Sequence, residues 1–346
     1  MTASKNILID VAPLGPPPWP TLDPFLFCVH HQDAYPAGNE NMEPVASLDG
    51  RAIGQDFSGK DGWSMYHSDR VPGFPQHPHR GFETVTVARS GFIDHSDSLG
   101  ASARFGDGDL QWMTAGRGIV HSEMFPLLRN DADNPTELFQ IWLNLPARRK
   151  MVDPYFSMFW DHQIPRLTTA DPDGRETTVV TYCGALPGAG DPANQPLSPP
   201  PDSWAADPSH DVSIWTIKME PDAKWTLPTA STGCNRRLYY FAGDTSEFEG
   251  EEHASGHALT LAPENSVQIR NGSEESEFLL LQGQPIGEPV AHYGPFVMND
   301  EEELRAAFAD YRATGFGGWP WPSDGPAHAR EADRFARHPD GRIEKA

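Results

Sequence analysis

The 346-residue sequence is poor in cysteine and in basic residues, and both shortages exclude classes of protein. Its three cysteines, Cys28, Cys183 and Cys234, lie far apart without a C-x-x-C pair, so neither a disulfide framework nor a zinc knuckle is expected. We expect buried or unreactive thiols in a reducing compartment. Lys and Arg number 26 against 49 Asp and Glu, which gives a net charge of −23. Such a chain repels phosphate backbones, so it is not expected to bind nucleic acid directly.

Long apolar runs are also missing. The N-terminal segment becomes Pro-rich and has no apolar core of signal-peptide length, and no later run could span a bilayer. We therefore expect a cytoplasmic protein without membrane contact. Gly and Pro are abundant, with 31 and 34 residues, and this suits short strands joined by turns better than a helical bundle.

Two sets of short strand-like runs follow one another along the chain. The first set lies at 25–29, 52–57, 84–88, 110–113 and 138–145, and the second at 177–182, 211–219, 237–241, 258–261, 266–269 and 277–281. Their rhythm predicts an all-β chain of two similar antiparallel β-barrels. A polar cap and an acidic first turn at 299–303 predict a short C-terminal helix that ends near Gly315.

The same pattern predicts the domain organisation. We expect an N-terminal arm at 1–23, a first barrel domain at 24–165, a second barrel domain with the closing helix at 166–315, and a C-terminal tail at 316–346. Within the second domain, the Pro- and Gly-rich stretch 184–210 indicates a long surface loop. Trp319 and Trp321 are expected to pack the tail onto the barrels, and contact with a ligand is the alternative.

Two dyads of potential metal ligands carry the strongest chemical signal. His77 and His79 are separated by one residue, and His121 and Glu123 repeat this spacing. Residues at i and i+2 of an extended segment point to one face. Two such dyads inside one barrel would supply three nitrogens and one oxygen to a metal ion and leave other positions open. This donor set suits Fe(II), and manganese, nickel, copper and zinc also fit it.

The choice of carboxylate ligand stays open at this level. Glu83 follows His79 on the next expected strand and competes with Glu123 for the metal. If Phe82 faces one side of that strand, Glu83 faces the other. For each single histidine, a packed or surface position is the alternative to a ligand.

Other polar residues give weaker signals. Arg80 and Arg117 could steer an anionic substrate, but we expect them to form salt bridges in so acidic a protein. His95 and Asp97 are expected to stabilise a turn rather than to act as a catalytic pair.

Three sequence runs resemble the pirin family. The run PQHPHRGFETV at 75–85 and the run QWMTAGRGIVHSE at 111–123 are similar to the family's signatures around its metal ligands. The run GPFVMN at 294–299 is similar to its closing motif. The resemblance, from about 25 to 315, implies a bicupin fold of two cupin-type antiparallel β-barrels. It also implies His77, His79, His121 and Glu123 as metal ligands, with Glu83 a non-ligand and a second barrel without metal.

The resemblance also implies a function. Relatives of pirins include quercetin 2,3-dioxygenases, which open the central flavonol ring with O2 and release carbon monoxide. On this basis we expect one divalent metal ion, Fe(II), a small aromatic substrate and O2. Glu123 would be both ligand and catalytic base, taking the proton of the flavonol 3-hydroxyl. The alternatives are a non-catalytic, iron-dependent redox-sensing regulator that binds a partner protein, and a cupin enzyme with another substrate. Pirins are often monomers, and we expect a monomer.

Overall fold

The computed structural model describes residues 7–188, 191 and 194–346, which form two compact units. The first unit consists of Val29–Asp161 and Glu288–Ala346, and the second of the described part of Met1–Cys28 with His162–Gly287. Antiparallel strands build both units, and the described residues contain a single α-helix, α1 (Glu301–Thr314). The prediction of an all-β chain with a short C-terminal helix is confirmed.

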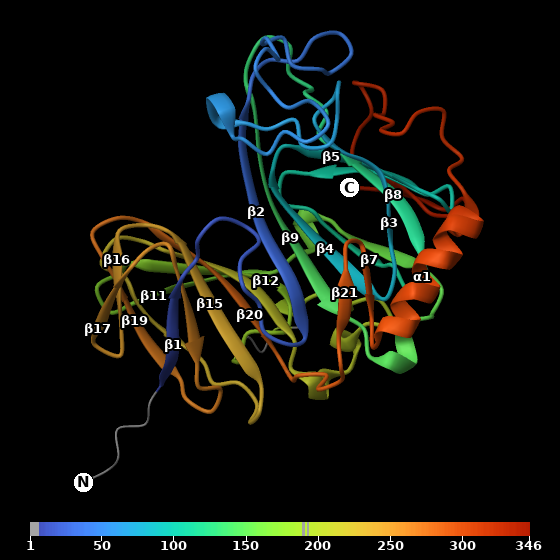
Figure 1. Cartoon of the computed structure of the whole chain (residues 1–346). Coiled ribbons are helices and arrows are strands. Elements are labelled where there is room, and N and C mark those ends of the chain that lie inside the picture. The colour runs from blue at the N-terminus through green and yellow to red at the C-terminus, as the bar shows by residue number, and fades with distance from the viewer. Residues whose placement is uncertain (1–6, 189–190, 192–193) are drawn as a thin grey trace. The chain divides into compact units, whose positions relative to one another are not determined.

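The first unit has two large sheets, whose longer strands lie side by side in Figure 1. The five-stranded sheet has the order β10 (Tyr155–Phe159), β7 (Leu110–Thr114), β4 (Phe82–Ser90), β9 (Asn134–Asn144) and β2 (Phe25–Tyr35). The six-stranded sheet has the order β24 (Ile343–Lys345), β23 (Phe335–Arg337), β6 (Ser102–Gly106), β5 (Phe92–Asp97), β8 (Ile119–Met124) and β3 (Gly73–His79). A hairpin of β21 (Ala291–Tyr293) and β22 (Phe296–Met298) precedes α1.

The second unit repeats this plan with different strand numbers. Its seven-stranded sheet has the order β1 (Leu8–Pro13), β18 (His257–Leu261), β15 (Asn235–Ala242), β20 (Ser276–Gly283), β13 (Ser213–Met219), β12 (Glu176–Cys183) and β11 (Arg166–Ala170). Its four-stranded sheet has the order β14 (Lys224–Leu227), β19 (Val267–Asn271), β16 (Thr245–Phe248) and β17 (Glu251–Ala254). Strand β1 lies within the predicted arm, of which residues 1–6 are outside the described residues.

The core of each unit lies between its two sheets. In the first unit Phe105 of β6, Met113 of β7 and Phe156 of β10 belong to one buried apolar cluster. Among the described residues the hydrogen-bonded strand order does not continue from one sheet of a unit to the other. Each unit therefore has the two facing antiparallel sheets of the predicted cupin-type barrel, and these sheets do not close into one continuous barrel.

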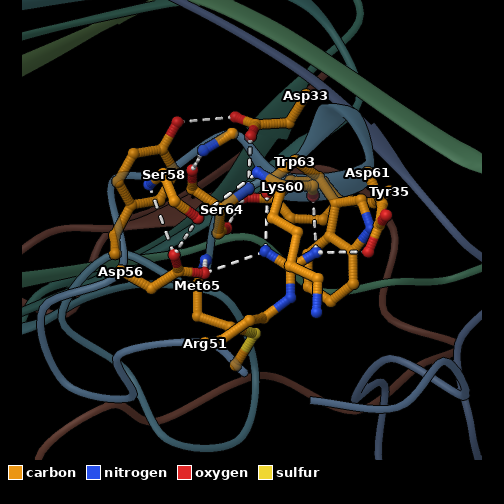
Figure 2. Close-up of polar contacts among 12 residues, drawn as sticks. Asp33, Tyr35, Arg51, Asp56, Ser58, Lys60, Asp61, Trp63, Ser64 and Met65 are labelled. Atoms are coloured by element: carbon orange, nitrogen blue, oxygen red, sulfur yellow. Dashed lines mark hydrogen bonds and ion pairs between the residues drawn. The ribbon is translucent and has the colours of Figure 1, made fainter. Parts of the chain in front are cut away.

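The long connection between β2 and β3 also departs from expectation. The predicted strand at 52–57 is wrong, because this stretch forms turns and a single bridge from Asp56 to Tyr66. Buried Arg51 organises it instead, with Nη1 donating hydrogen bonds to Asp56 Oδ2 at 2.9 Å and to the Trp63 carbonyl at 2.8 Å. Its guanidinium lies 3.4 Å from the centre of the Trp63 ring. Figure 2 shows these contacts. Satisfying this buried charge outweighs the local strand preference.

The C-terminal residues pack onto the first unit. Strand β23 pairs with β6, with Ala336 opposite Ala103, and so extends the six-stranded sheet. Trp321 Nε1 donates a hydrogen bond to the Asp97 carbonyl at 2.8 Å, which confirms the predicted packing for this residue, whereas Trp319 Nε1 donates to the Ser323 carbonyl within the tail at 2.7 Å. Helix α1 begins after Asp300, whose side chain accepts hydrogen bonds from two backbone amides, and ends at Gly315 with φ 54°. No helix in the described part of the chain is long and apolar enough to cross a bilayer.

Two remaining predictions concern the loop and the thiols. The predicted loop 184–210 contains short 3-10 helices at Trp204–Ala206 and Pro208–His210. Its residues 189–190 and 192–193 lie outside the described residues. All three cysteines are free and buried, as predicted.

Candidate metal centre

Strands β3 and β8 bring the three predicted histidines together. They pair so that His77 lies opposite His121 and His79 opposite Ile119. Strand alternation then turns all three imidazoles to one face. Their ring centres are 4.4 to 5.0 Å apart, and their candidate ligand nitrogens all lie within 4.8 Å of one another. One metal ion could therefore contact all three rings.

Hydrogen bonds fix which nitrogen two of these rings present. His77 Nδ1 lies 2.9 Å from the Pro75 carbonyl, and His79 Nδ1 lies 3.4 Å from the Pro295 carbonyl. A carbonyl only accepts, so each Nδ1 carries the proton and each Nε2 keeps its lone pair. Ligating histidines usually have this arrangement.

The surroundings of His121 fit a metal ion most directly. Its ring is fully buried, yet neither ring nitrogen has a hydrogen-bond partner among the described residues. Buried polar atoms are seldom left unsatisfied. A cation at the meeting point of the three rings would satisfy one of these nitrogens. The site thus fits the metal that the donor set implies.

Burial keeps the three imidazoles neutral. Desolvation lowers the pKa of His77 to about 4, and the nearby His67 and His95 contribute to the decrease. Burial and neighbouring histidines hold the pKa values of His79 and His121 well below the usual range. Because metals bind the neutral imidazole, the site needs no deprotonation at pH 7. His77 is partly exposed, whereas the other two rings are buried, so the cluster opens to solvent on its side.

Glu123 lies at the edge of the histidine cluster. Its Oε2 is 4.0 Å from His121 Nε2 and accepts a hydrogen bond from Gln140 Nε2 at 3.0 Å. Its Oε1 is 3.0 Å from the Thr86 hydroxyl. Burial raises the pKa of Glu123. The carboxylate is thus held in place beside the three imidazoles, and its role as fourth ligand stays a prediction.

Glu83 points away from this cluster. Its neighbour Phe82 faces the histidines, with ring centres 5.0 Å from His79 and 4.2 Å from Trp142. Strand alternation places Glu83 on the opposite face of β4, where it accepts a hydrogen bond from Thr114 at 2.6 Å. This geometry favours Glu123 over Glu83 as the carboxylate near the metal.

The structure adds two residues to the surroundings of the site. His95 is fully buried on β5, with its ring centre 5.5 Å from that of His121 and its Nε2 3.3 Å from Asp97 Oδ2. Asp97 Oδ1 accepts hydrogen bonds from the backbone amides of Leu99 and Ala101, so the predicted turn role is confirmed for this residue. The place of His95 beside the cluster was not predicted. The signal that could have indicated it is a third i, i+2 pair on an adjacent strand.

The two arginines form ion pairs, as predicted. Arg80 Nη1 lies 3.0 Å from Asp310 of α1, and its guanidinium covers the Phe316 ring at 4.4 Å. Arg117 pairs with Asp153 at 3.1 Å on the surface. Neither pair includes a residue of the histidine cluster.

Comparison with known proteins places this geometry in a family. The family model described as Pirin matches residues 19–143, and the one described as Pirin C-terminal cupin domain matches 214–317. Human Pirin is 33% identical over 284 residues, which cover 79% of this chain and 89% of that protein. A Pseudomonas aeruginosa protein named "Putative quercetin 2,3-dioxygenase" is 34% identical over 247 residues, which cover 70% of this chain and 80% of that protein.

Solved structures show the same fold. The crystal structure of quercetin 2,3-dioxygenase from Acinetobacter baumannii matches with a TM-score of 0.66 and 24% identity, over 90% of this chain and 96% of that one. With the matched cupin domain, this likeness identifies the two sandwich units as a bicupin. Human Pirin is 33% identical and the match covers most of both chains, and two pirin family models match this sequence. The chain therefore belongs to the pirin family.

Proposed function

We propose that this pirin-family chain is a metal-dependent dioxygenase that opens the ring of a flavonol or a similar hydroxylated aromatic. The observation that carries the proposal is the trio of neutral imidazoles, with His121 buried and unpartnered within the described residues, next to the carboxylate of Glu123. The relative and the solved structure named for quercetin 2,3-dioxygenase support this reaction type.

His77, His79 and His121 would hold one divalent ion, with Glu123 as the fourth ligand. Fe(II) is the metal we propose, because imidazole and carboxylate donors with open positions suit it. When bound, such an ion would lower the pKa of the substrate hydroxyl and supply the redox chemistry that O2 requires. The partly exposed side of His77 is where a substrate would reach the site.

Glu123 would take the hydroxyl proton. The Thr86 hydroxyl lies between Glu123 Oε1 at 3.0 Å and Gln140 Oε1 at 2.5 Å, and it has only one proton to share between them. An ionised Glu123 leaves one of these contacts without a proton. A protonated Glu123 fills both, since it donates to Thr86 while Thr86 donates to Gln140. The local hydrogen bonds therefore favour proton uptake, in agreement with the raised pKa of Glu123.

Aromatic side chains complete the surroundings of the histidines. Phe82 and Trp142 pack with their ring centres 4.2 Å apart next to His79, and Phe74 lies 6.3 Å from His77. Phe82 is fully buried, so the partly exposed rings of Trp142 and Phe74 are the flat apolar surfaces that would bind a planar aromatic and displace water from its face. They suit a flavonol-like substrate better than a small polar one.

The test is turnover by the iron-loaded protein. Wild type and His79→Ala would be loaded anaerobically with Fe(II) and exposed to quercetin in air, while absorbance loss and carbon monoxide are measured. We expect metal-dependent bleaching with carbon monoxide release from wild type and almost none from His79→Ala. His162→Ala is the matched control, because His162 is exposed and belongs to the second unit. Tight iron binding without turnover would contradict the proposal and favour the redox-sensing regulator.

A further inference from the structure

An aromatic wall adjoins the candidate metal centre. It consists of His31, Phe57, Tyr66 and Phe74, all in the first unit. Tyr66 stacks on Phe74 with ring centres 4.9 Å apart, and His31 meets the edge of both rings at 4.9 and 5.8 Å. Phe74 is also the neighbour of His77, so the wall continues from the candidate ligands. His31 and Phe74 are partly exposed, and Phe57 is 57% exposed.

His31 is the polar group of this wall that can contact a ligand. It lies on the core-facing side of β2, as do Asp33 and Tyr35, whereas Gln32 and Ala34 on the other side are exposed. Its Nδ1 is 2.9 Å from the Tyr66 hydroxyl. No hydrogen bond to its Nε2 is formed by the described part of the chain. The half-buried ring therefore presents one unused nitrogen beside the aromatic surface.

Asp33 determines the tautomer of this histidine. The Tyr66 hydroxyl is 2.7 Å from Asp33 Oδ2 and 2.9 Å from His31 Nδ1, and it has one proton. An ionised carboxylate only accepts, so that proton goes to Asp33, and the Tyr66 oxygen accepts a proton from His31 Nδ1. Burial and the neighbouring His30 lower the pKa of His31 to about 3, which keeps the ring neutral. His31 Nε2 is thus a lone-pair acceptor at neutral pH.

The connection between β2 and β3 holds this relay rigid. Asp33 Oδ1 accepts a hydrogen bond from the Ser64 amide at 2.8 Å, and Figure 2 shows Asp33 beside Ser64 above the Arg51–Trp63 stack. The backbones of Asp56 and Tyr66 exchange two hydrogen bonds of 2.9 Å. Since Arg51 fixes Asp56, the buried ion pair sets the position of Tyr66 as well.

We propose that His31 Nε2 accepts a hydrogen bond from a phenolic hydroxyl on the part of the substrate remote from the metal, with Asp33 and Tyr66 as positioning residues. The substrate class is then a planar polyphenol with two separated polar ends. One end carries the hydroxyl bound at the three histidines, and the other carries a phenol that reaches His31. This inference rests on the proposed function, because it assigns a second contact to the same substrate.

Anaerobic binding tests the contact without turnover. Fe(II)-loaded protein would be titrated with quercetin and with 3-hydroxyflavone, which keeps the metal-binding hydroxyl but lacks the remote phenols. We expect wild type to prefer quercetin by about tenfold, the value of one hydrogen bond. His31→Phe should lose this preference and bind 3-hydroxyflavone as wild type does. His30→Phe is the matched control, because His30 faces the other side of β2 and contacts Glu137.

Asp33→Asn tests whether the hydrogen bonds from Asp33 through Tyr66 to His31 set the substrate preference, or whether the packing of these side chains is sufficient. The Ser64 amide keeps the amide oxygen at the Oδ1 position, so the new NH2 group faces Tyr66 and donates to it. Tyr66 must then donate to His31 Nδ1, which moves the His31 proton to Nε2. A phenol accepts a hydrogen bond less well than it donates one, so we expect this near-isosteric variant to lower the quercetin preference several-fold with metal content unchanged. A preference equal to that of wild type would overturn the relay.

A second measurement, by NMR, determines the tautomer of His31 in the wild type and does not depend on substrate binding by any variant. Ring 15N shifts of His31 in Zn(II)-loaded wild type, assigned by their absence in His31→Phe, should show a protonated Nδ1 and a bare Nε2. A protonated Nε2, or equal wild-type affinity for the two flavonols, would overturn the inference. Binding preference without carbon monoxide release would instead contradict the proposed reaction and leave the contact intact.

Discussion

His95 lies directly opposite Glu123 across the pairing of β5 and β8, and two positions along the same strands Asp97 lies opposite His121. The candidate ligands of β8 therefore have two buried polar neighbours on β5, His95 and Asp97. Outer groups of this kind hold metal ligands in orientation and adjust their affinity. We therefore expect His95 and Asp97 to influence metal binding at the candidate centre, in addition to the four predicted ligands.

The first prediction concerns His95. His95→Leu removes the partner of Asp97 Oδ2 next to His121 and should weaken metal binding by about tenfold while all three histidines still bind. A chelator competition titration with Zn(II) measures the affinity. An unchanged dissociation constant would make His95 a packing residue only, and complete loss of the metal would make it a ligand itself.

The second prediction separates the two buried carboxylates. Glu123→Gln should lower turnover by about a hundredfold and lower metal content much less, because it removes the proton acceptor but keeps the hydrogen-bonding shape. Glu83→Gln is the matched control on the opposite face of β4, and it should change neither quantity. Steady-state assays and metal analysis on the same preparations give both values. Equal losses in turnover and metal content for Glu123→Gln would argue against the base role.

The third prediction follows from the pKa of Asp33. Burial raises this pKa from 3.8 to about 6, so the folded state holds the proton more tightly than the unfolded state. The resulting stabilisation is complete below about pH 4 and is lost as the pH rises through 6. Relative to Asp33→Asn, wild type should lose about 2 kcal/mol of unfolding free energy between pH 4 and pH 7. Urea denaturation of both proteins across this range measures the difference, and parallel curves would refute it.

The fourth prediction concerns the attachment of the C-terminal tail. Fully buried Arg104 makes two hydrogen bonds of 2.7 and 2.8 Å to Asp94 and donates to backbone carbonyls of residues 328–332. Arg104→Met leaves Asp94 buried without its ion-pair partner and should destabilise the fold by about 3 to 5 kcal/mol. Limited proteolysis should then cleave the tail first.

Arg117 provides the comparison for this fourth prediction. It forms an exposed ion pair with Asp153, so Arg117→Met should change stability by less than about 1 kcal/mol. Similar unfolding free energies for the two variants would show that the buried arginine does not anchor the tail.

The sequence predicts local alternation well and long-range pairing poorly. The i, i+2 rule could assign His77 and His79 to one face of their strand, and His121 and Glu123 to one face of theirs, because it depends only on an extended backbone. The pairing of Ala336 with Ala103 joins residues far apart in the chain, and no local pattern indicates it. The capped helix before Gly315 was predictable because its signals lie within a few residues.

Two errors have the same physical origin. The stretch 52–57 has strand-like composition, but the buried charge of Arg51 requires partners that an extended segment could not supply. His95 stands among turn-forming residues, yet the pairing of β5 with β8 brings it beside the candidate metal centre. In both cases tertiary contacts outweigh local preference.

X-ray absorption spectroscopy of the protein loaded anaerobically with Fe(II) tests the proposed metal centre most directly. We expect one iron per chain, with three imidazole nitrogens and a carboxylate oxygen as protein ligands, and no stoichiometric binding by His121→Ala. Iron that binds equally well in His121→Ala, or a wild type that binds no iron, would contradict this expectation.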